Sequence, residues 1–173
     1  MNTFIIAALT LDGKIAKYPE HNSYSWTCAE DKKFFIEKTK DAGVVILGRK
    51  TWELIGKPFE DRLVVVMTRR MGQGSGDKGQ GIRGVEFTDK SPAEILSDLE
   101  NRGFKGAAVA GGAEVYAEFL RADLVDEMFI TVHSIIFGEG IDFVSGVEID
   151  NFDVLDTKMF GSKSCLLHVR HRV

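Results

Sequence analysis

The sequence has little of what marks several common classes of protein. Its two cysteines, Cys28 and Cys165, lie far apart and form neither a C-x-x-C pair nor a metal-binding spacing. We therefore expect two reduced thiols, as in a cytoplasmic protein, and no metal site. The N-terminal apolar run, Phe4–Leu9, is too short to span a membrane and lacks the basic start of a signal peptide. No membrane partner is expected.

An excess of basic residues is also missing, as is any catalytic arrangement of histidines. The 173 residues carry a net charge of −4, which argues against a nucleic-acid partner but leaves room for a local basic pocket. The four histidines show neither a Ser-His-Asp order nor a metal-ligand spacing. We expect each of them to be structural or exposed.

Apolar runs and capping patterns alternate along most of the chain. The runs predict buried strands at Phe4–Leu9, Val44–Leu47, Leu63–Met67, Val85–Phe87, Ala107–Ala110 and Met128–Val132. Helices are predicted after the capping boxes Thr27–Glu30 and Ser91–Glu94, over Thr51–Ile55, and from Gly112 to Leu120. Phe152–Phe160 and Ser164–Arg170 predict a closing hairpin. We expect one α/β domain over residues 1–173, with three layers, a largely parallel central sheet and an antiparallel C-terminal edge.

Three glycine-bearing segments could bind a ligand. Residues 74–79 match G-x-G-x-x-G, but no helix pattern follows, so we interpret them as a flexible loop. Gly111-Gly112 joins a predicted strand to a helix, which suits either a bound phosphate or a plain tight turn. Gly48-Arg49-Lys50-Thr51 repeats this arrangement with two cations, and Thr68-Arg69-Arg70 ends the next strand. These strand ends form either a nest for a phosphorylated dinucleotide or a surface basic cluster.

The stretch WTCAEDKKFF places Asp31 in the first turn of a predicted helix. Asp31 and Phe35 are four residues apart and share a face, whereas Lys32, Lys33 and Glu37 can lie on the solvent side. Asp31 therefore either faces a ligand or complements the helix dipole. Helix spacing alone leaves both interpretations open.

These segments together resemble dihydrofolate reductase over nearly the whole chain, and more distantly the reductase domain of riboflavin biosynthesis. The matching segments are AALTLDGKIA, WTCAEDKKFF, VILGRKTWELIGKPFEDR, VVVMTRR, AGGAEVYAEFL and MFITVH. The resemblance implies a dihydrofolate-reductase-like fold and the NADPH-dependent reduction of 7,8-dihydrofolate to 5,6,7,8-tetrahydrofolate. It implies a small-molecule substrate and either a monomer or a homodimer.

The resemblance also assigns substrate roles residue by residue. Asp31 matches the catalytic carboxylate that holds the pterin ring, and Phe35 the aromatic residue that packs on the ligand. Arg62 matches the arginine that binds the glutamate tail of folate. The same resemblance adds four substrate-binding residues: Ile6, Ala8, Lys57 and Thr131. The loop from Asp12 to Trp26 corresponds to the mobile flap over the site.

NADPH is the cofactor that the resemblance implies. Its predicted binding residues are Ala8, Ile15, Gly48, Arg49, Lys50, Thr51, Met67, Thr68, Arg69, Gly111, Gly112, Ala113, Glu114, Val115 and Tyr116. Glu114 stands where many folate reductases carry a basic residue near the extra phosphate of NADPH.

The alternative is a reductase of the riboflavin type, which also uses NADPH but reduces a ribosylamino-pyrimidine phosphate. LTLDGKIA and LVDEMFITVHSIIFGEG are closer to that group. Its members often carry a glutamate just before the Gly-Gly pair, where this chain has Ala110. A third interpretation is a nucleotide-binding protein without catalytic activity on the same scaffold.

Overall fold

The computed structural model describes residues 1–173 apart from 70–80, 151 and 173. The glycine-rich G-x-G-x-x-G segment and Arg70 lie outside the described residues. The strands are β1 (Asn2–Thr10), β2 (Lys14–Ala16), β3 (Val44–Gly48), β4 (Leu63–Met67), β5 (Val85–Thr88), β6 (Gly106–Val109), β7 (Glu127–His133), β8 (Ile141–Asp142), β9 (Phe152–Phe160) and β10 (Ser164–His171). The helices are α1 (Ala29–Ala42), α2 (Arg49–Ile55), α3 (Pro92–Asn101) and α4 (Ala113–Arg121), with a 3-10 turn, η1, at Ser23–Ser25.

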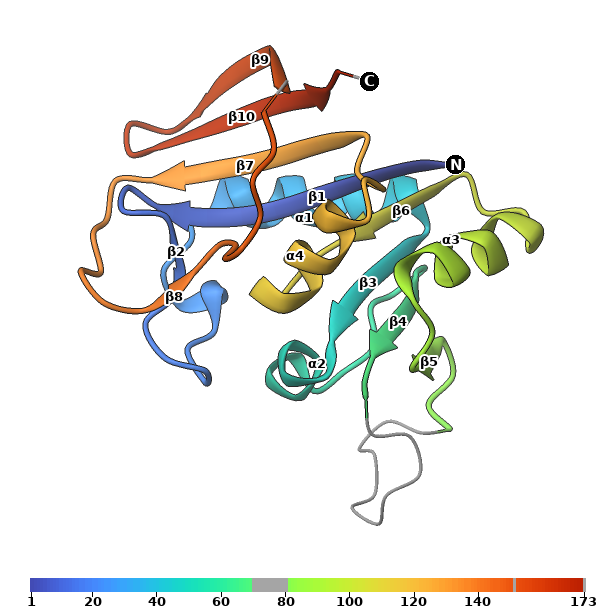
Figure 1. The fold of residues 1–173 in the computed structure, drawn as a ribbon. Coiled ribbons are helices and arrows are strands. Elements are labelled where there is room, and N and C mark those ends of the chain that lie inside the picture. Colours follow the sequence, from blue (N-terminus) through green and yellow to red (C-terminus); the bar gives the residue numbers. More distant parts are fainter. Residues whose placement is uncertain (70–80, 151, 173) are drawn as a thin grey trace.

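A single eight-stranded sheet forms the middle of the molecule, in the order β5-β4-β3-β6-β1-β7-β10-β9 (Figure 1). The first six strands in this order are parallel to their neighbours. Strand β10 is antiparallel to β7, and β9 is antiparallel to β10. The predicted parallel sheet with an antiparallel C-terminal edge is confirmed.

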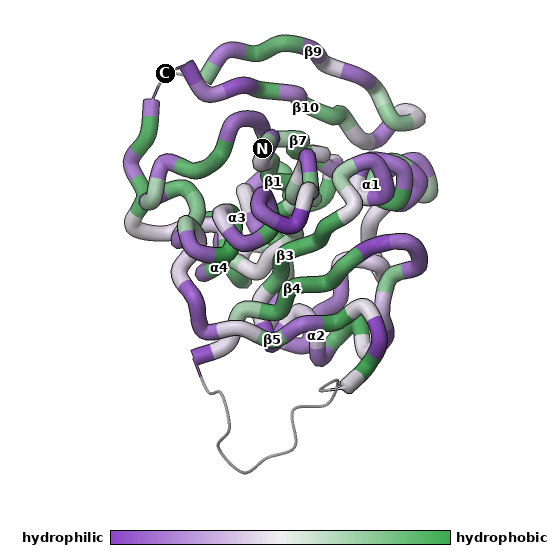
Figure 2. The backbone as a smooth tube through the Cα atoms, turned by 90° about the vertical axis from the view of Figure 1, so that its right-hand side faces the viewer, coloured by the Kyte–Doolittle hydropathy of each residue, from purple (hydrophilic) through white to green (hydrophobic). Residues whose placement is uncertain are grey.

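Side chains that alternate along β3 pack against helices on opposite faces of the sheet. Val45 and Leu47 belong to the same core cluster as Trp52 of α2, which is only 2% exposed. Val44 and Ile46 belong to the other face, which α3 and α4 cover. Strands β3 and β4 are hydrophobic along their whole length (Figure 2). A strand buried on both faces explains why these segments read as unbroken apolar runs.

Two neighbouring strands separate at their carboxyl ends. Strands β1 and β6 pair from Asn2 only as far as Ile5, which is opposite Val109. Strand β1 then continues beside β7 until Thr10 lies opposite His133. The sheet therefore opens between β1 and β6 at the edge where parallel α/β sheets bind their ligands.

The two predicted capping boxes have different outcomes. In α3, Ser91 Oγ accepts from Glu94 N, and Glu94 Oε2 accepts from Ser91 N at 2.9 Å, so this box is confirmed. In α1 the predicted box was wrong, because the N-cap is Cys28 and no side chain caps it. Thr27 lies one position before the N-cap. Its N–H donates to Ser23 O, so Thr27 belongs to the turn that begins with η1.

A second, two-stranded sheet of β2 and β8 was not predicted. Gly140, just before β8, has φ +148°, and a Cβ there would lie 2.3 Å from the carbonyl oxygen of Ala16. Asp12 supports the same region by accepting N–H bonds from Phe137 and Gly138 at 3.2 and 2.8 Å. The loops around the sheet opening are therefore joined to each other.

Among the described residues, no helix has both the length and the apolar character needed to cross a membrane. The same residues contain no cluster of three or more histidine, cysteine or acidic side chains suited to a metal ion.

Candidate active site

A cleft of about 2040 Å³ begins where β1 and β6 separate and extends across the carboxyl ends of β3 and β4. Pockets for one drug-sized ligand usually measure about 300–1,000 Å³, so this cleft has room for two ligands side by side. Every residue predicted to bind substrate or cofactor lines the cleft, with the single exception of Thr131. Thr131 lies on β7 with 1% exposure, and its contact with a substrate stays a prediction.

The first turn of α1 places a carboxylate in the wall of this cleft. Asp31 is held there with its side chain 14% exposed, and Phe35 lies one turn further along the same helix. Phe35 packs against Phe59 with ring centroids 5.9 Å apart. Ile6 and Ala8 of β1 supply an apolar surface to the same cleft. A flat, partly polar ligand would fit between these groups.

Arg62 and two lysines also line the cleft. The guanidinium of Arg62 donates from Nη1 to Thr39 Oγ1 at 2.7 Å and lies 4.7 Å above the ring of Phe59. Burial is the main cause that lowers the pKa of Arg62. The two lysines are Lys57 and Lys32. Lys32 is half-buried, with its Nζ 4.8 Å above the exposed ring of Tyr24.

Glycines bring the turns β3–α2 and β6–α4 into direct contact. Gly48 N donates to Gly111 O at 2.7 Å. A Cβ on Gly48 would lie 3.1 Å from Val115 Cγ2, and one on Gly112 would lie 3.3 Å from Thr51 Oγ1. The N-caps of α2 and α4 are Gly48 and Gly112, with no side-chain cap bond. The first N–H groups of α4 are thus left for an anionic ligand.

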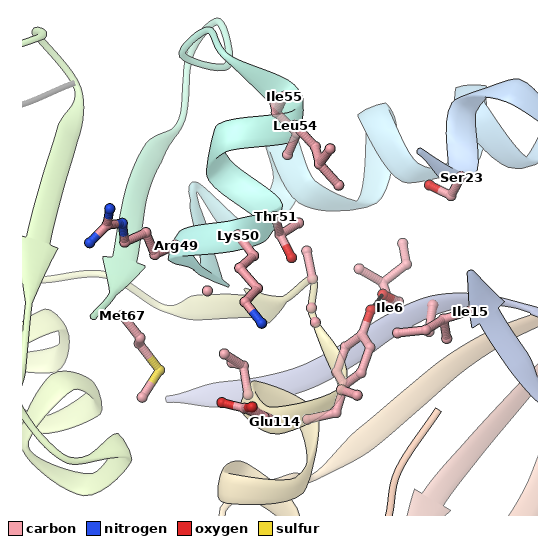
Figure 3. A pocket seen from close by; sticks show the side chains of 18 of the residues that line it. Ile6, Ile15, Ser23, Arg49, Lys50, Thr51, Leu54, Ile55, Met67 and Glu114 are labelled. Carbon is pink, nitrogen blue, oxygen red and sulfur yellow. Dashed lines mark hydrogen bonds between the residues drawn. The ribbon is translucent and has the colours of Figure 1, made fainter. Parts of the chain in front are cut away.

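Charges of both signs surround these glycine turns. Lys50 reaches into the cleft toward Glu114 of α4, while Arg49 points away from Glu114, and the hydroxyl of Thr51 faces inward (Figure 3). Arg49 Nε donates to Glu53 at 2.9 Å. Arg69 Nη2 lies 3.0 Å from Glu118 and 3.8 Å from Glu114, and the bond to Glu118 raises the pKa of Arg69.

Tyr116 closes the inner end of the opening. Its hydroxyl donates to Ile6 O at 3.1 Å and therefore bridges α4 to β1 where the sheet has parted. A Cβ on Gly111, which has φ +114°, would lie 3.1 Å from this hydroxyl. Burial, and secondarily the charge of Asp31, raises the pKa of Tyr116, so it remains a neutral phenol.

Sequence reasoning missed the groups that lie behind Asp31. His133 of β7 places its Nε2 3.7 Å from Asp31 Oδ2, and Ser164 of β10 contacts the other ring nitrogen at 2.8 Å. The ring of Trp26 crosses that of His133 edge to face at 5.3 Å. These residues come from distant segments, so no sequence spacing could reveal their contact.

The fold and the site together define an α/β protein with a two-ligand cleft at the carboxyl ends of its parallel strands. The family model described as dihydrofolate reductase matches residues 3–164. The chain therefore belongs to the dihydrofolate reductase family, a family of oxidoreductases.

Known proteins similar to this chain carry several different names. "Uncharacterized protein YwjB" of Bacillus subtilis (strain 168) is 31% identical, with 97% of each chain covered. The crystal structure of "Putative riboflavin biosynthesis protein" from Shewanella sp. PV-4 has a TM-score of 0.84 at 20% identity, and all of both chains is covered. Dihydrofolate reductase from Enterococcus faecalis, complexed with NADP(H), has a TM-score of 0.76 at 24% identity, with 99% of this chain and 96% of that chain covered. At these identities the two structures show the shared fold.

Proposed function

We propose that the protein is an NADPH-dependent reductase that converts 7,8-dihydrofolate into 5,6,7,8-tetrahydrofolate. The observation that carries this proposal is the position of Asp31, whose carboxylate lines the cleft beside Phe35 and the apolar surface of Ile6 and Ala8. Membership of the dihydrofolate reductase family supports it.

Asp31 is suited to holding a pterin. A carboxylate has two oxygens that accept in parallel from adjacent N–H groups, which a pterin ring presents along one edge. The side chain is 14% exposed, so these bonds would form with little competition from water. Phe35 and Ile6 would pack on the two faces of the ring and fix its position relative to the cofactor.

Arg62 is suited to the carboxylate tail of the substrate. Its bonds to Thr39 Oγ1 and to Glu60 O, together with the ring of Phe59, fix the plane of the guanidinium. A fixed guanidinium binds a carboxylate through two parallel N–H donors. Its partial burial, which lowers the pKa of Arg62, makes an anionic partner more favourable at this position.

The glycine turns are suited to NADPH, which when bound supplies the hydride for the reduction. The absence of Cβ atoms at Gly48 and Gly112 lets the two turns pack against each other at the cleft, and the α4 N–H groups attract phosphate. Lys50 adds a cation on the cleft side. Tyr116 would lie near the reacting ring and would exclude water at the inner end of the cleft.

A ribosylamino-pyrimidine phosphate is the second candidate substrate. Lys32, Lys57 and Arg62 all line the cleft, and cations suit a phosphate as well as a carboxylate. This second candidate keeps the same cofactor and the same role for Asp31, but the three cations would then bind the phosphate of the substrate.

Oxidation of NADPH, followed by its absorbance with each substrate in parallel, tests the proposal. We expect turnover with dihydrofolate and a decrease in kcat/KM of about 10²-fold or more in Asp31→Asn, since acid–base groups contribute about 10²–10⁴-fold. Glu30→Gln is the matched control, because it removes a neighbouring acid that does not line the cleft. Turnover of the pyrimidine phosphate alone would replace the proposed reaction by the second candidate.

A further inference from the structure

A buried histidine lies directly behind Asp31 with one ring nitrogen unpaired. The side chain of His133 is 3% exposed, and its Nε2 has no hydrogen-bond partner among the described residues. This nitrogen lies 3.7 Å from Asp31 Oδ2, which is close but too long for a formed hydrogen bond. Buried polar atoms without a partner are rare in folded proteins, so this one requires a reason.

Ser164 is placed to let the proton of His133 sit on Nε2. Its Oγ lies 2.8 Å from His133 Nδ1, and both side chains are buried. When the hydroxyl donates to Nδ1, the proton of the neutral ring is on Nε2. That tautomer directs an N–H toward the carboxylate of Asp31, whereas the other tautomer would direct a lone pair toward it.

The ring of His133 is held in place by its surroundings. Its strand β7 pairs on one side with β1, where Thr10 is opposite, and on the other with β10, where Ser164 is opposite. Trp26 covers the ring edge to face at 5.3 Å. In the part of the chain that the structure describes, Asp31 is the only charged group within ion-pair distance of His133.

We propose that His133 is a positioning residue for Asp31. With Ser164 donating to Nδ1, the proton lies on Nε2, and this N–H attracts Oδ2 of Asp31 across 3.7 Å, so that Oδ1 is the oxygen left to contact the substrate. A carboxylate held in one orientation presents its free oxygen reproducibly, and misplacement of such a group by about 1 Å costs about 10²-fold in rate. The identity of the substrate rests on the proposed function, but the contact of His133 with Asp31 does not.

The tautomer of His133 can be measured in the free protein. Two-bond ¹H–¹⁵N correlation spectra of ¹⁵N-labelled protein distinguish a protonated Nε2 from a protonated Nδ1. We expect the Nε2–H form in the wild type and a mixture of forms in Ser164→Ala. An Nδ1–H form in the wild type would overturn the proposal. No substrate is needed, so this result stands even if the protein does not reduce dihydrofolate.

Two variants separate the donor from the bulk of the imidazole. Glutamine at position 133 can place an amide N–H near the position of Nε2, whereas leucine fills space without a donor. We expect His133→Leu to lower kcat/KM about 10–100-fold and His133→Gln to stay within about fivefold of the wild type. The Michaelis constant for NADPH should not change in either variant, because His133 does not line the cleft.

Equal losses in His133→Leu and His133→Gln would show a purely structural role, and full activity in His133→Leu would show that Asp31 does not depend on His133; either result overturns the proposal. His171→Leu is the matched control, since it removes a half-buried histidine that does not contact Asp31. Thermal unfolding of each variant identifies any loss that comes from misfolding. If the leucine variant does not fold, the activity of Ser164→Ala together with the tautomer spectra decides the outcome.

Discussion

Glu114 brings a negative charge to the part of the cleft that is proposed to bind phosphate. Its side chain is 79% exposed on the first turn of α4, and Lys50 reaches toward it from α2 (Figure 3). Arg69 lies 3.8 Å from the same carboxylate and 3.0 Å from that of Glu118. Each cation that could bind a phosphate here has an acid beside it, and the negative charge of that acid weakens the attraction between the cation and the phosphate.

Removal of this charge should favour the phosphorylated dinucleotide. In Glu114→Gln we expect the Kd for NADPH to fall about two- to fivefold, as is typical of an exposed charge contact, and that for NADH to change less. Fluorescence titration with both cofactors measures this. Glu148→Gln is an exposed change of equal charge outside the cleft and should leave both constants unchanged. The effect should diminish at high ionic strength, and an equal change for both cofactors would contradict the prediction.

Residue roles were the least predictable part of the site. Helix spacing placed Asp31 and Phe35 on one face, but only the family resemblance distinguished a ligand-facing acid from one that complements the dipole. Helix spacing allows Lys32 on the solvent side, and it did not reveal that Lys32 lines the cleft beside the ring of Tyr24. The contact of His133 with Asp31 depends on the packing of β7 against α1, which no local pattern in the sequence encodes.

Among the helices, α3 has the best-capped N-terminus. Ser91 and Glu94 exchange backbone and side-chain hydrogen bonds, and Pro92 occupies the first turn. The bond from Ser91 is the largest cause that lowers the pKa of Glu94. Because Ile95 and Leu99 of this helix are buried in the core, fraying at its start would expose apolar surface.

Loss of this cap should destabilise the whole domain. Ser91→Ala is expected to lower the free energy of unfolding by about 1 kcal/mol, the usual value for an N-cap serine. Urea denaturation followed by circular dichroism measures this. Ser97→Ala, an exposed substitution within the same helix, should be neutral or slightly stabilising because alanine favours helix. Similar losses in both variants would argue against capping as the cause.

Elements with a strong local pattern were predicted, whereas β2, β8 and η1, of three residues or fewer, were not. Strand β4 was predicted over Leu63–Met67, as the structure has it, since a strand buried on both faces leaves an unbroken apolar run. The start of α1 was misplaced because Thr27–Glu30 matches the capping pattern while η1 uses the N–H of Thr27. Strand β8 spans only Ile141–Asp142, and pairing with β2 rather than its own sequence defines it.

At the scale of the whole molecule, Asp12 links segments that are far apart in the sequence. It accepts from Thr10 Oγ1 at 2.6 Å and from the N–H groups of Phe137 and Gly138. The bond from Thr10 is the largest cause that lowers the pKa of Asp12 from 3.8 to about 2. One carboxylate therefore joins the end of β1 to the loop that follows β7.

This lowered pKa predicts a specific dependence of stability on pH. The carboxylate stabilises the fold fully above pH about 4, and this contribution is lost as the pH falls toward about 2. Melting temperatures of wild type and Asp12→Asn, measured from pH 7 to pH 2, should differ by a constant amount at high pH and converge below pH about 4. A difference that persists to pH 2 would contradict the assignment.

The long outer edge of the sheet affects how the protein must be handled. Strand β9 runs for nine residues, and no other described strand pairs with its outer side. It exposes Val154 and Met159 by 60% and 59%. An unpaired strand edge with apolar side chains favours pairing with a strand of another chain. Specific activity and elution volume therefore need to be compared over a series of protein concentrations before any rate is assigned to a monomer.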